Sequence, residues 1–127
     1  MKILVTGAAG FIGMFVAERL LARGDSVIGI DNLNDYYDVS LKQSRLDRLL
    51  TQTNFEFIKV DIADRDSMKA VFKKQHFDVV IHLAAQAGVR HSIDHPELYI
   101  DSNLTGFANI LEGCRQTKVA HLVYASS

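Results

Sequence analysis

The sequence has little cysteine and proline and no long apolar run. Its 127 residues include one cysteine, Cys114, and one proline, Pro96, beside eight glycines. A single cysteine excludes an internal disulfide framework and is typical of a reducing cytosol, and so few prolines and glycines argue against disordered linkers. No apolar stretch could span a bilayer, and the first residues lack the layout of a signal peptide. We therefore expect one globular domain of a cytoplasmic protein.

Net charge is also nearly absent. The 14 basic and 15 acidic side chains almost cancel and leave a formal net charge of −1. Nucleic acids and anionic membranes attract strongly basic surfaces, so we expect neither as a partner. The hydrophobic content of 48% is sufficient for a buried core in a chain of this length.

The first residues contain a glycine-rich turn between a predicted strand and a predicted helix. Residues 3–5 form a short apolar run typical of a buried strand, and Gly7, Gly10 and Gly13 interrupt the pattern before a helix over residues 11–21. This order places a helix N-terminus, with its free N–H groups and positive dipole end, against a phosphate. The glycines allow a tight turn, a close approach to a pyrophosphate and close packing of helix on strand.

Asp31 supports this interpretation. It ends the next predicted strand, over residues 26–30, and lies 18 residues after Gly13. This is close to the spacing of about 20 residues at which an acidic side chain meets an adenosine ribose. Its carboxylate would accept hydrogen bonds from ribose hydroxyls and repel a 2′-phosphate, which favours NAD over NADP. The alternative is a solvated aspartate at the end of a strand.

The rest of the chain alternates predicted helices and strands. Ser40 is expected to cap a short surface helix, and Asp64 is expected to cap the next helix. Asp94 is expected to cap a long helix that ends near Gln116, with Glu97 as its reciprocal capping partner. Further strands are expected over residues 55–60, 78–83 and 120–125, and a loop of small residues over 84–91. In the first helix, apolar side chains should share one broad face, opposite Glu18 and Arg19: Phe11, Ile12, Phe15, Val16 and Leu20. The alternation predicts an α/β fold, a Rossmann-type doubly wound parallel sheet with five strands.

Other polar residues allow two interpretations each. Asp61 follows a strand where an adenine could lie, but it equally suits a capping or loop position. Arg90 is either solvated or contacts a phosphate or carboxylate at the sheet edge. His82 is interpreted as a packed, hydrogen-bonded side chain. His91 and His95 have a spacing that could chelate a metal, but no third ligand is evident and no metal site is expected.

Four stretches carry a more specific signal, and they are Thr6-Gly-Ala-Ala-Gly-Phe-Ile-Gly13, Asp31-Asn-Leu-Asn34, His82-Leu-Ala-Ala85 and Tyr124-Ala-Ser-Ser127. Together they resemble the extended short-chain dehydrogenase/reductase family of nucleotide-sugar epimerases and dehydratases. Asn34-Asp-Tyr-Tyr-Asp38 and Ala84-Ala-Gln-Ala-Gly-Val-Arg90 are most similar to the UDP-glucuronate 4-epimerases. The resemblance covers the whole chain but only the N-terminal part of such a protein. We therefore expect residues 1–127 to form an incomplete NAD-binding Rossmann domain, without the last strands and the C-terminal substrate domain.

The resemblance implies a site for NAD and a UDP-sugar, with no metal. The implied cofactor-binding residues are Gly7, Gly10, Phe11, Ile12 and Gly13 at the pyrophosphate, Asp31 and Asn32 at the ribose, Asp61 and Ile62 beside the adenine, Leu83, Ala84 and Ala85 beneath the cofactor, and Asn103 as support from the long helix. Arg90 is the implied substrate contact. Ser127, which with Ser126 ends the last strand at the ligand-binding edge, is the implied catalytic hydroxyl and would hydrogen-bond the sugar hydroxyl that is oxidised.

The implied reaction inverts C4 of the sugar through a 4-keto intermediate, with NAD taking a hydride and returning it to the opposite face. The family's Tyr-x-x-x-Lys pair does not occur, because none of the four tyrosines, Tyr36, Tyr37, Tyr99 and Tyr124, is followed by lysine four residues later. A general base contributes about 10²–10⁴ in rate, so we expect a truncated chain that is inactive alone. The alternatives are a dehydratase or reductase of the same family, or a non-catalytic nucleotide-binding module. The parent protein is expected to be a homodimer.

Overall fold

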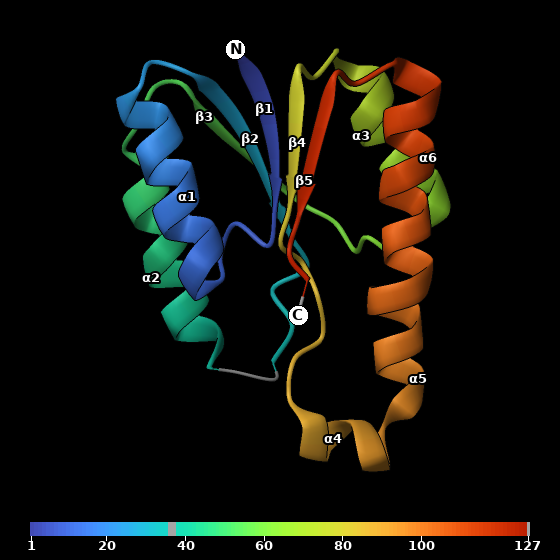
Figure 1. Cartoon of the computed structure of the whole chain (residues 1–127). Helices are drawn as coiled ribbons and strands as arrows, with labels where there is room; N and C mark the ends of the chain where they lie inside the picture. The colour runs from blue at the N-terminus through green and yellow to red at the C-terminus, as the bar shows by residue number, and fades with distance from the viewer. Residues whose placement is uncertain (36–37, 127) are drawn as a thin grey trace.

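A five-stranded parallel sheet lies at the centre of the chain, with helices on both faces (Figure 1). The structure, a computed structural model, describes residues 1–35 and 38–126. The strands, in chain order, are Lys2–Thr6 (β1), Ser26–Asp31 (β2), Phe55–Lys59 (β3), Val79–His82 (β4) and His121–Tyr124 (β5). The spatial order is β3-β2-β1-β4-β5, and every neighbouring pair is parallel. The predicted doubly wound α/β fold is confirmed.

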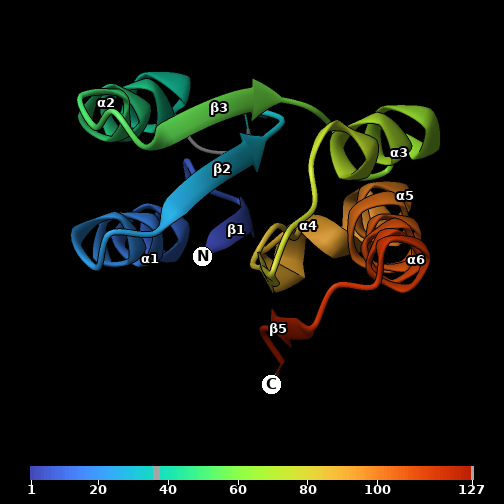
Figure 2. The ribbon, with the colours of Figure 1, turned by 90° about the horizontal axis from the view of Figure 1, so that it is seen from above.

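Two helices cover one face of the sheet, and a third helix and a long helical rod cover the other. Phe11–Ala22 (α1) and Val39–Leu50 (α2) lie together on one side, as Figure 2 shows from above. The other side carries Arg65–Lys74 (α3) and a continuous rod made of Pro96–Tyr99 (α5), the π-helix Ile100–Gly106 (η1) and Phe107–Thr117 (α6). The short helix Val89–Asp94 (α4) lies beyond the carboxyl ends of the strands (Figure 1). Among the described residues, no helix is both long and apolar enough to cross a membrane.

The central strand β1 divides the core into two halves because its side chains alternate between the faces of the sheet. Ile3 and Val5 are buried with the helix α1 on one face, and Leu4 is buried with α3 and α6 on the other. From β1 the chain moves outward through β2 and β3, and it then returns to the opposite side of β1 as β4. The loops after β1 and β4 therefore diverge, and doubly wound sheets bind ligands at this point.

The predicted apolar face of the first helix is partly wrong. Phe11, Ile12 and Phe15 are 66%, 62% and 48% exposed, and α1 instead packs on the sheet mainly through Met14 and Ala17 with Leu20 and Leu21. The first turn of α1 starts at the carboxyl edge of the sheet, so its outer side chains have no strand beneath them. The rings of Phe11 and Phe15 meet edge to face, with centroids 5.4 Å apart.

Two of the three predicted helix caps are also wrong. Asp38, not Ser40, caps α2, and its carboxylate accepts from the backbone N–H of Ser40 at 2.9 Å. Asp94 is the last residue of α4, a helix that was not predicted and that begins inside the expected loop over residues 84–91. The N-cap of α5 is therefore His95, whose side chain makes no capping hydrogen bond. Asp64 does cap α3, as predicted, by accepting from the N–H of Ser67.

Candidate functional site

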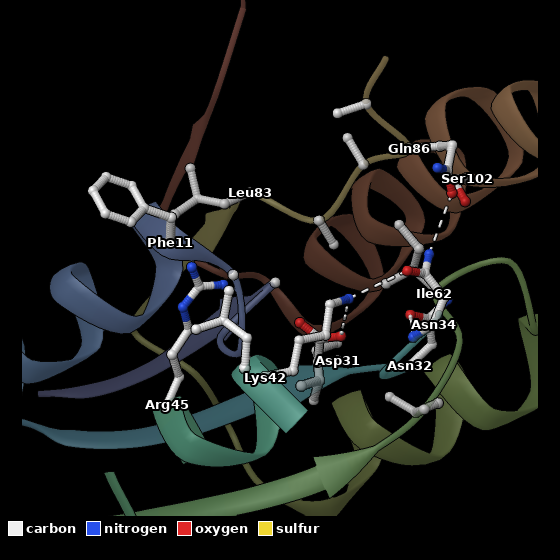
Figure 3. A pocket seen from close by; sticks show the side chains of 18 residues that line it. Phe11, Asp31, Asn32, Asn34, Lys42, Arg45, Ile62, Leu83, Gln86 and Ser102 are labelled. Atoms are coloured by element: carbon white, nitrogen blue, oxygen red, sulfur yellow. Dashed lines mark hydrogen bonds and ion pairs between the residues drawn. The ribbon is translucent and has the colours of Figure 1, made fainter. Parts of the chain in front are cut away.

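A cleft of about 450 Å³ opens at the carboxyl edge of the sheet, above the glycine turn (Figure 3). Its walls come from the ends of β1, β2, β3 and β4, from α2 and from η1. Most of the predicted cofactor-binding residues line it, and these are Gly7, Gly10, Phe11, Asp31, Asn32, Ile62, Leu83, Ala84 and Ala85. The structure thus brings together three of the four sequence motifs, those at residues 6–13, 31–34 and 82–85, which lie far apart in the chain.

The glycine turn is shaped by contacts that only glycine permits. Gly7 has a φ of +72°, and its N–H donates to the carbonyl of Ile30 at 2.9 Å, which ties the turn to β2. A Cβ on Gly13 would lie 2.0 Å from the carbonyl oxygen of Gly7, so the first turn of α1 touches the turn itself. Gly10, the N-cap of α1, has no side chain to accept from the first N–H groups of the helix. These donors and the positive dipole end are left at the edge of the cleft.

Asp31 is buried, with 8% of its surface exposed, which excludes the alternative of a solvated aspartate. One carboxylate oxygen accepts from the backbone N–H of Ala9 at 3.2 Å, and the other accepts from the N–H of Leu33 at 2.8 Å. The ammonium group of Lys42 lies 3.5 Å from the second oxygen. The carboxylate is therefore fixed against the glycine turn at the cleft wall.

The loop after β4 is held against the same turn by one hydroxyl group. Thr6 Oγ1 accepts from the backbone N–H groups of Leu83 and Ala84, both at 2.9 Å, and lies 2.7 Å from Nδ1 of His82. His82 is buried and stacks on the ring of Phe107, with centroids 5.5 Å apart. Burial lowers the pKa of His82 to about 4. The interpretation of His82 as a packed, hydrogen-bonded residue is confirmed.

A row of amide side chains crosses the mouth of the cleft. Asn103 on η1 accepts from the N–H of Gln86 at 2.8 Å and donates to its carbonyl at 3.1 Å. The side chain of Gln86 accepts from the amide of Asn34 at 3.2 Å, and Asn34 accepts from Lys42 at 3.3 Å. Asn103 thus supports the wall from the long helix without lining the cleft, and the loop after β2 is joined to the loop after β4.

Sequence reasoning missed Lys42, Asn34 and Gln86 as members of the site. For Lys42 a signal was present, because it shares the buried face of α2 with Leu46 and Leu49 at helical spacing. A lysine among leucines on such a face needs a polar partner. For Gln86 no local signal exists, because its partners come from segments far along the chain.

Other predicted site residues lie away from the cleft or outside the described residues. Arg90 is exposed on α4 and does not line the cleft. Asp61 is exposed, and its carboxylate accepts from the N–H of Ala63 at 2.9 Å, as in a loop residue. Ile12 and Gly13, on the first turn of α1, do not line the cleft; Ile12 is exposed and Gly13 is buried. Ser127, and the tyrosines at 36 and 37, fall outside the residues that the structure describes.

A second hollow of about 380 Å³ adjoins the first and shares the segment 83–85 with it. Its other walls include His82, Asn103, Tyr124 and Ser126. It therefore lies at the ends of β4 and β5, on the opposite side of β1 from β2 and β3. In the described part of the chain, no three His, Cys, Asp or Glu side chains are grouped as a metal site would require.

The family assignment comes from comparison with known proteins. A family model described as GDP-mannose 4,6 dehydratase matches residues 4–127. The chain belongs to this family. Membership agrees with the resemblance to extended short-chain dehydrogenases/reductases drawn from the sequence motifs, and the observed sheet order and glycine turn are consistent with it.

Several proteins similar to this chain bear the names of enzymes. UDP-glucuronate 4-epimerase of Thermodesulfobacterium geofontis is 50% identical over 124 residues, which are 98% of this chain and 38% of that protein. Protein CapI of Staphylococcus aureus is 52% identical over 127 residues, again 38% of its length. The crystal structure of UDP-glucuronic acid 4-epimerase from Bacillus cereus, in complex with UDP-glucuronic acid and NAD, matches with a TM-score of 0.90 and 36% identity, over 100% of this chain and 40% of that one. The chain thus spans 38% to 40% of the length of these relatives.

Proposed function

We propose that the protein containing this chain is a nucleotide-sugar 4-epimerase that interconverts UDP-glucuronate and UDP-galacturonate, and that residues 1–127 hold its NAD. The observation that carries the proposal is the single cleft in which the glycine turn meets Asp31 and the loop after β4. The relatives named UDP-glucuronate 4-epimerase supply the substrate class. The cytoplasm as location and a homodimer as assembly remain predictions from the sequence.

The residues present fit a dinucleotide. The glycines let α1 start directly against the turn, because a Cβ at Gly10 would lie 3.1 Å and one at Gly13 2.0 Å from the carbonyl oxygen of Gly7. Gly7 and Gly10 line the cleft without side chains, so a pyrophosphate could approach the backbone there. The exposed start of α1 supplies the N–H groups and the dipole for the phosphates. Asp31 stands where the adenosine ribose would lie, with one lone pair of its Ala9-bound oxygen unused.

Apolar side chains complete the expected cofactor contacts. Ile30, Val60 and Ile62 line the cleft beside Asp31 and form a wall suited to an adenine ring. The small residues Ala84 and Ala85 leave room for the nucleotide to pass toward the second hollow. When bound, NAD would supply the hydride acceptor. The chain's own residues would bind and orient it and hold water away from its apolar side.

Two roles in this proposal rest on the family resemblance alone. Ser127 would hydrogen-bond the sugar hydroxyl that is oxidised, and Arg90 would contact the substrate. The general base would come from a Tyr-x-x-x-Lys pair elsewhere in the parent protein. A dehydratase is the second candidate, because the matching family model bears that description.

Binding of NAD tests the first half of the proposal. Calorimetric titration of the chain with NAD should give saturable binding, and Asp31→Ala should weaken it at least about tenfold because the ribose hydroxyls lose their acceptor. Asp47→Ala is the matched control, since Asp47 is an exposed aspartate on α2 that bonds only Gln43 among the described residues. Equal losses in both variants, or no binding by the unaltered chain, would contradict the proposal.

Product analysis of the parent protein tests the second half. Incubation with UDP-glucuronate, followed by proton NMR, should show UDP-galacturonate accumulating until the two sugars reach equilibrium. No net consumption of NAD should accompany this conversion. Inverted C4 stereochemistry supports the epimerase. Loss of water from GDP-mannose, with UDP-glucuronate left unchanged, would establish the dehydratase instead.

A further inference from the structure

Lys42 is a buried cation inside the proposed nucleotide site. Only 8% of its surface is exposed, although lysine is among the residues least often buried without a partner. It stands on the first turn of α2 and lines the cleft beside Asp31 (Figure 3). Its ammonium group lies 3.5 Å from Asp31 Oδ1 and 3.3 Å from Asn34 Oδ1.

The hydrogen-bonding capacity of this group is not exhausted. An ammonium group has three N–H donors; one donates to Asn34, and even if a second is directed at the ion-paired carboxylate of Asp31, a third is left. The third has no recorded partner among the described residues, at a position that lines the cleft. An oxygen of a ligand placed against Asp31 would therefore be within the reach of Lys42.

Lys42 also changes the electrostatic character of the ribose position. An isolated carboxylate at this place would repel a 2′-phosphate strongly. Here the carboxylate of Asp31 has an opposite charge 3.5 Å away, in a largely buried setting where solvent screens the interaction weakly. Arg45, one turn further along α2, also lines the cleft and donates to the carbonyl of Ala9 at 3.2 Å. The three side chains together carry one negative and two positive charges.

We propose that Lys42 is a specificity-determining residue of the nucleotide site: its ammonium group hydrogen-bonds the adenosine ribose beside Asp31 and limits how strongly Asp31 rejects a 2′-phosphate. The proposal rests on the proposed function, because it requires that a dinucleotide binds in the cleft. Asp31 alone then does not determine the preference for NAD over NADP. The Asp31–Lys42 pair acts as one unit.

The test measures the dissociation constants of NAD and NADP by calorimetry and uses their ratio, NADP over NAD, as the readout. Lys42→Met keeps the length of the side chain but removes the charge and the donor. It should weaken NAD binding about threefold to tenfold and raise the ratio at least about tenfold, because the carboxylate is then uncompensated. Lys42→Arg keeps the charge and should leave the ratio within about threefold of the unaltered protein.

Two further variants separate charge from folding. Lys42→Gln keeps a donor without the charge, and it should raise the ratio as Lys42→Met does even if the methionine variant folds poorly. Lys73→Met, at an exposed position on α3, removes the same charge far from the cleft and should change neither constant. The increase in the ratio should shrink at high ionic strength, because added salt screens the unpaired carboxylate.

The outcomes are distinguishable. A ratio that stays within about threefold in both neutral variants, with NAD still bound, overturns the role of Lys42 and leaves the NAD site intact. Absence of NAD binding by the unaltered protein overturns the proposed function and, with it, the role of Lys42. Thermal unfolding of each variant shows whether a weakened affinity reflects the site or the fold.

Discussion

The hydroxyl group of Thr6 donates its hydrogen to Nδ1 of His82. The two groups lie 2.7 Å apart, and the backbone N–H groups of Leu83 and Ala84 both donate to the same hydroxyl oxygen. A hydroxyl has two lone pairs and one hydrogen, so with both lone pairs occupied its hydrogen goes to the imidazole. His82 is therefore neutral and carries its own hydrogen on Nε2.

This arrangement predicts a specific dependence of stability on pH. Burial lowers the pKa of His82 to about 4 from 6.5, so between these values the unfolded chain binds a proton that the folded chain does not. The contribution of neutral His82 to the free energy of unfolding should be complete above about pH 6.5. Below that pH the free energy of unfolding should fall by up to about 1.4 kcal/mol per pH unit, and by about 3 kcal/mol in all by about pH 4. Urea unfolding at several pH values measures this slope.

The matched variants are His82→Gln and His76→Gln. Replacing His82 should lower stability at pH 7, because the stacking on Phe107 and the bond from Thr6 are lost, and should flatten the slope between pH 4 and 6.5. His76 is exposed, and its replacement should leave the slope as it is. A slope that survives the loss of His82 would contradict the assigned cause.

Gly13→Ala should damage both the fold and the nucleotide site. The new methyl group would lie 2.0 Å from the carbonyl oxygen of Gly7, a backbone atom that cannot move without opening the glycine turn. We expect a loss of about 1–3 kcal/mol in the free energy of unfolding and at least about a tenfold loss in NAD affinity. Gly24→Ala is the control: Gly24 has a φ of +92° and no atom within 4 Å of the added carbon. It should lose stability only, because of backbone strain, and bind NAD normally.

Asn103→Ala should loosen the wall of the cleft. It removes the two hydrogen bonds that Asn103 makes to the backbone N–H and carbonyl of the buried Gln86, at a cost of about 1–3 kcal/mol. Amide hydrogen exchange over residues 84–88 should accelerate, and NAD affinity should fall. Asn54→Ala removes a comparable side-chain bond, to the carbonyl of Asp25, at the opposite edge of the sheet. Stability should fall there with NAD affinity unchanged, and equal affinity losses would refute a role for Asn103 in the cleft.

Cys114 should be unreactive in the folded chain. Burial raises the pKa of its thiol to about 11 from 9.0, so at pH 8 about 0.1% is thiolate instead of about 10%. Alkylation by iodoacetamide should therefore be about a hundredfold slower in buffer than in 8 M urea, as followed by mass spectrometry. Similar rates under the two conditions would mean that the thiol is not shielded as described.

The fold and the floor of the site were predictable because their signals are local. The apolar run before Gly7, the spacing of the glycines and Asp31 at the end of β2 each restrict the backbone within a few residues. Parallel strands then bring these segments to one edge without further information. The cap at Asp64 was likewise predictable from its immediate neighbours.

The parts that sequence reasoning missed depend on contacts between distant segments. The prediction of the buried face of α1 was partly wrong because the sequence of residues 11–21 does not indicate where the helix begins relative to the edge of the sheet. Phe11 and Phe15 lie beyond that edge and are exposed. The prediction that Asp94 caps the long helix was wrong because Asp94 is the last residue of α4. Lys42 joins the site only because α2 folds back over β2, beside Asp31.

Between Ala87 and Ser102, which both line the cleft, the chain leaves it and returns at one point, where Asn103 holds Gln86 by both of its backbone groups. The excursion between these anchors includes α4 with Arg90, and no side chain in α4 is buried. A closed surface loop of this kind can change in length and composition while its two ends stay fixed. Substitutions and changes of length can therefore be confined to this excursion, and the cleft beside it need not be rebuilt when they occur.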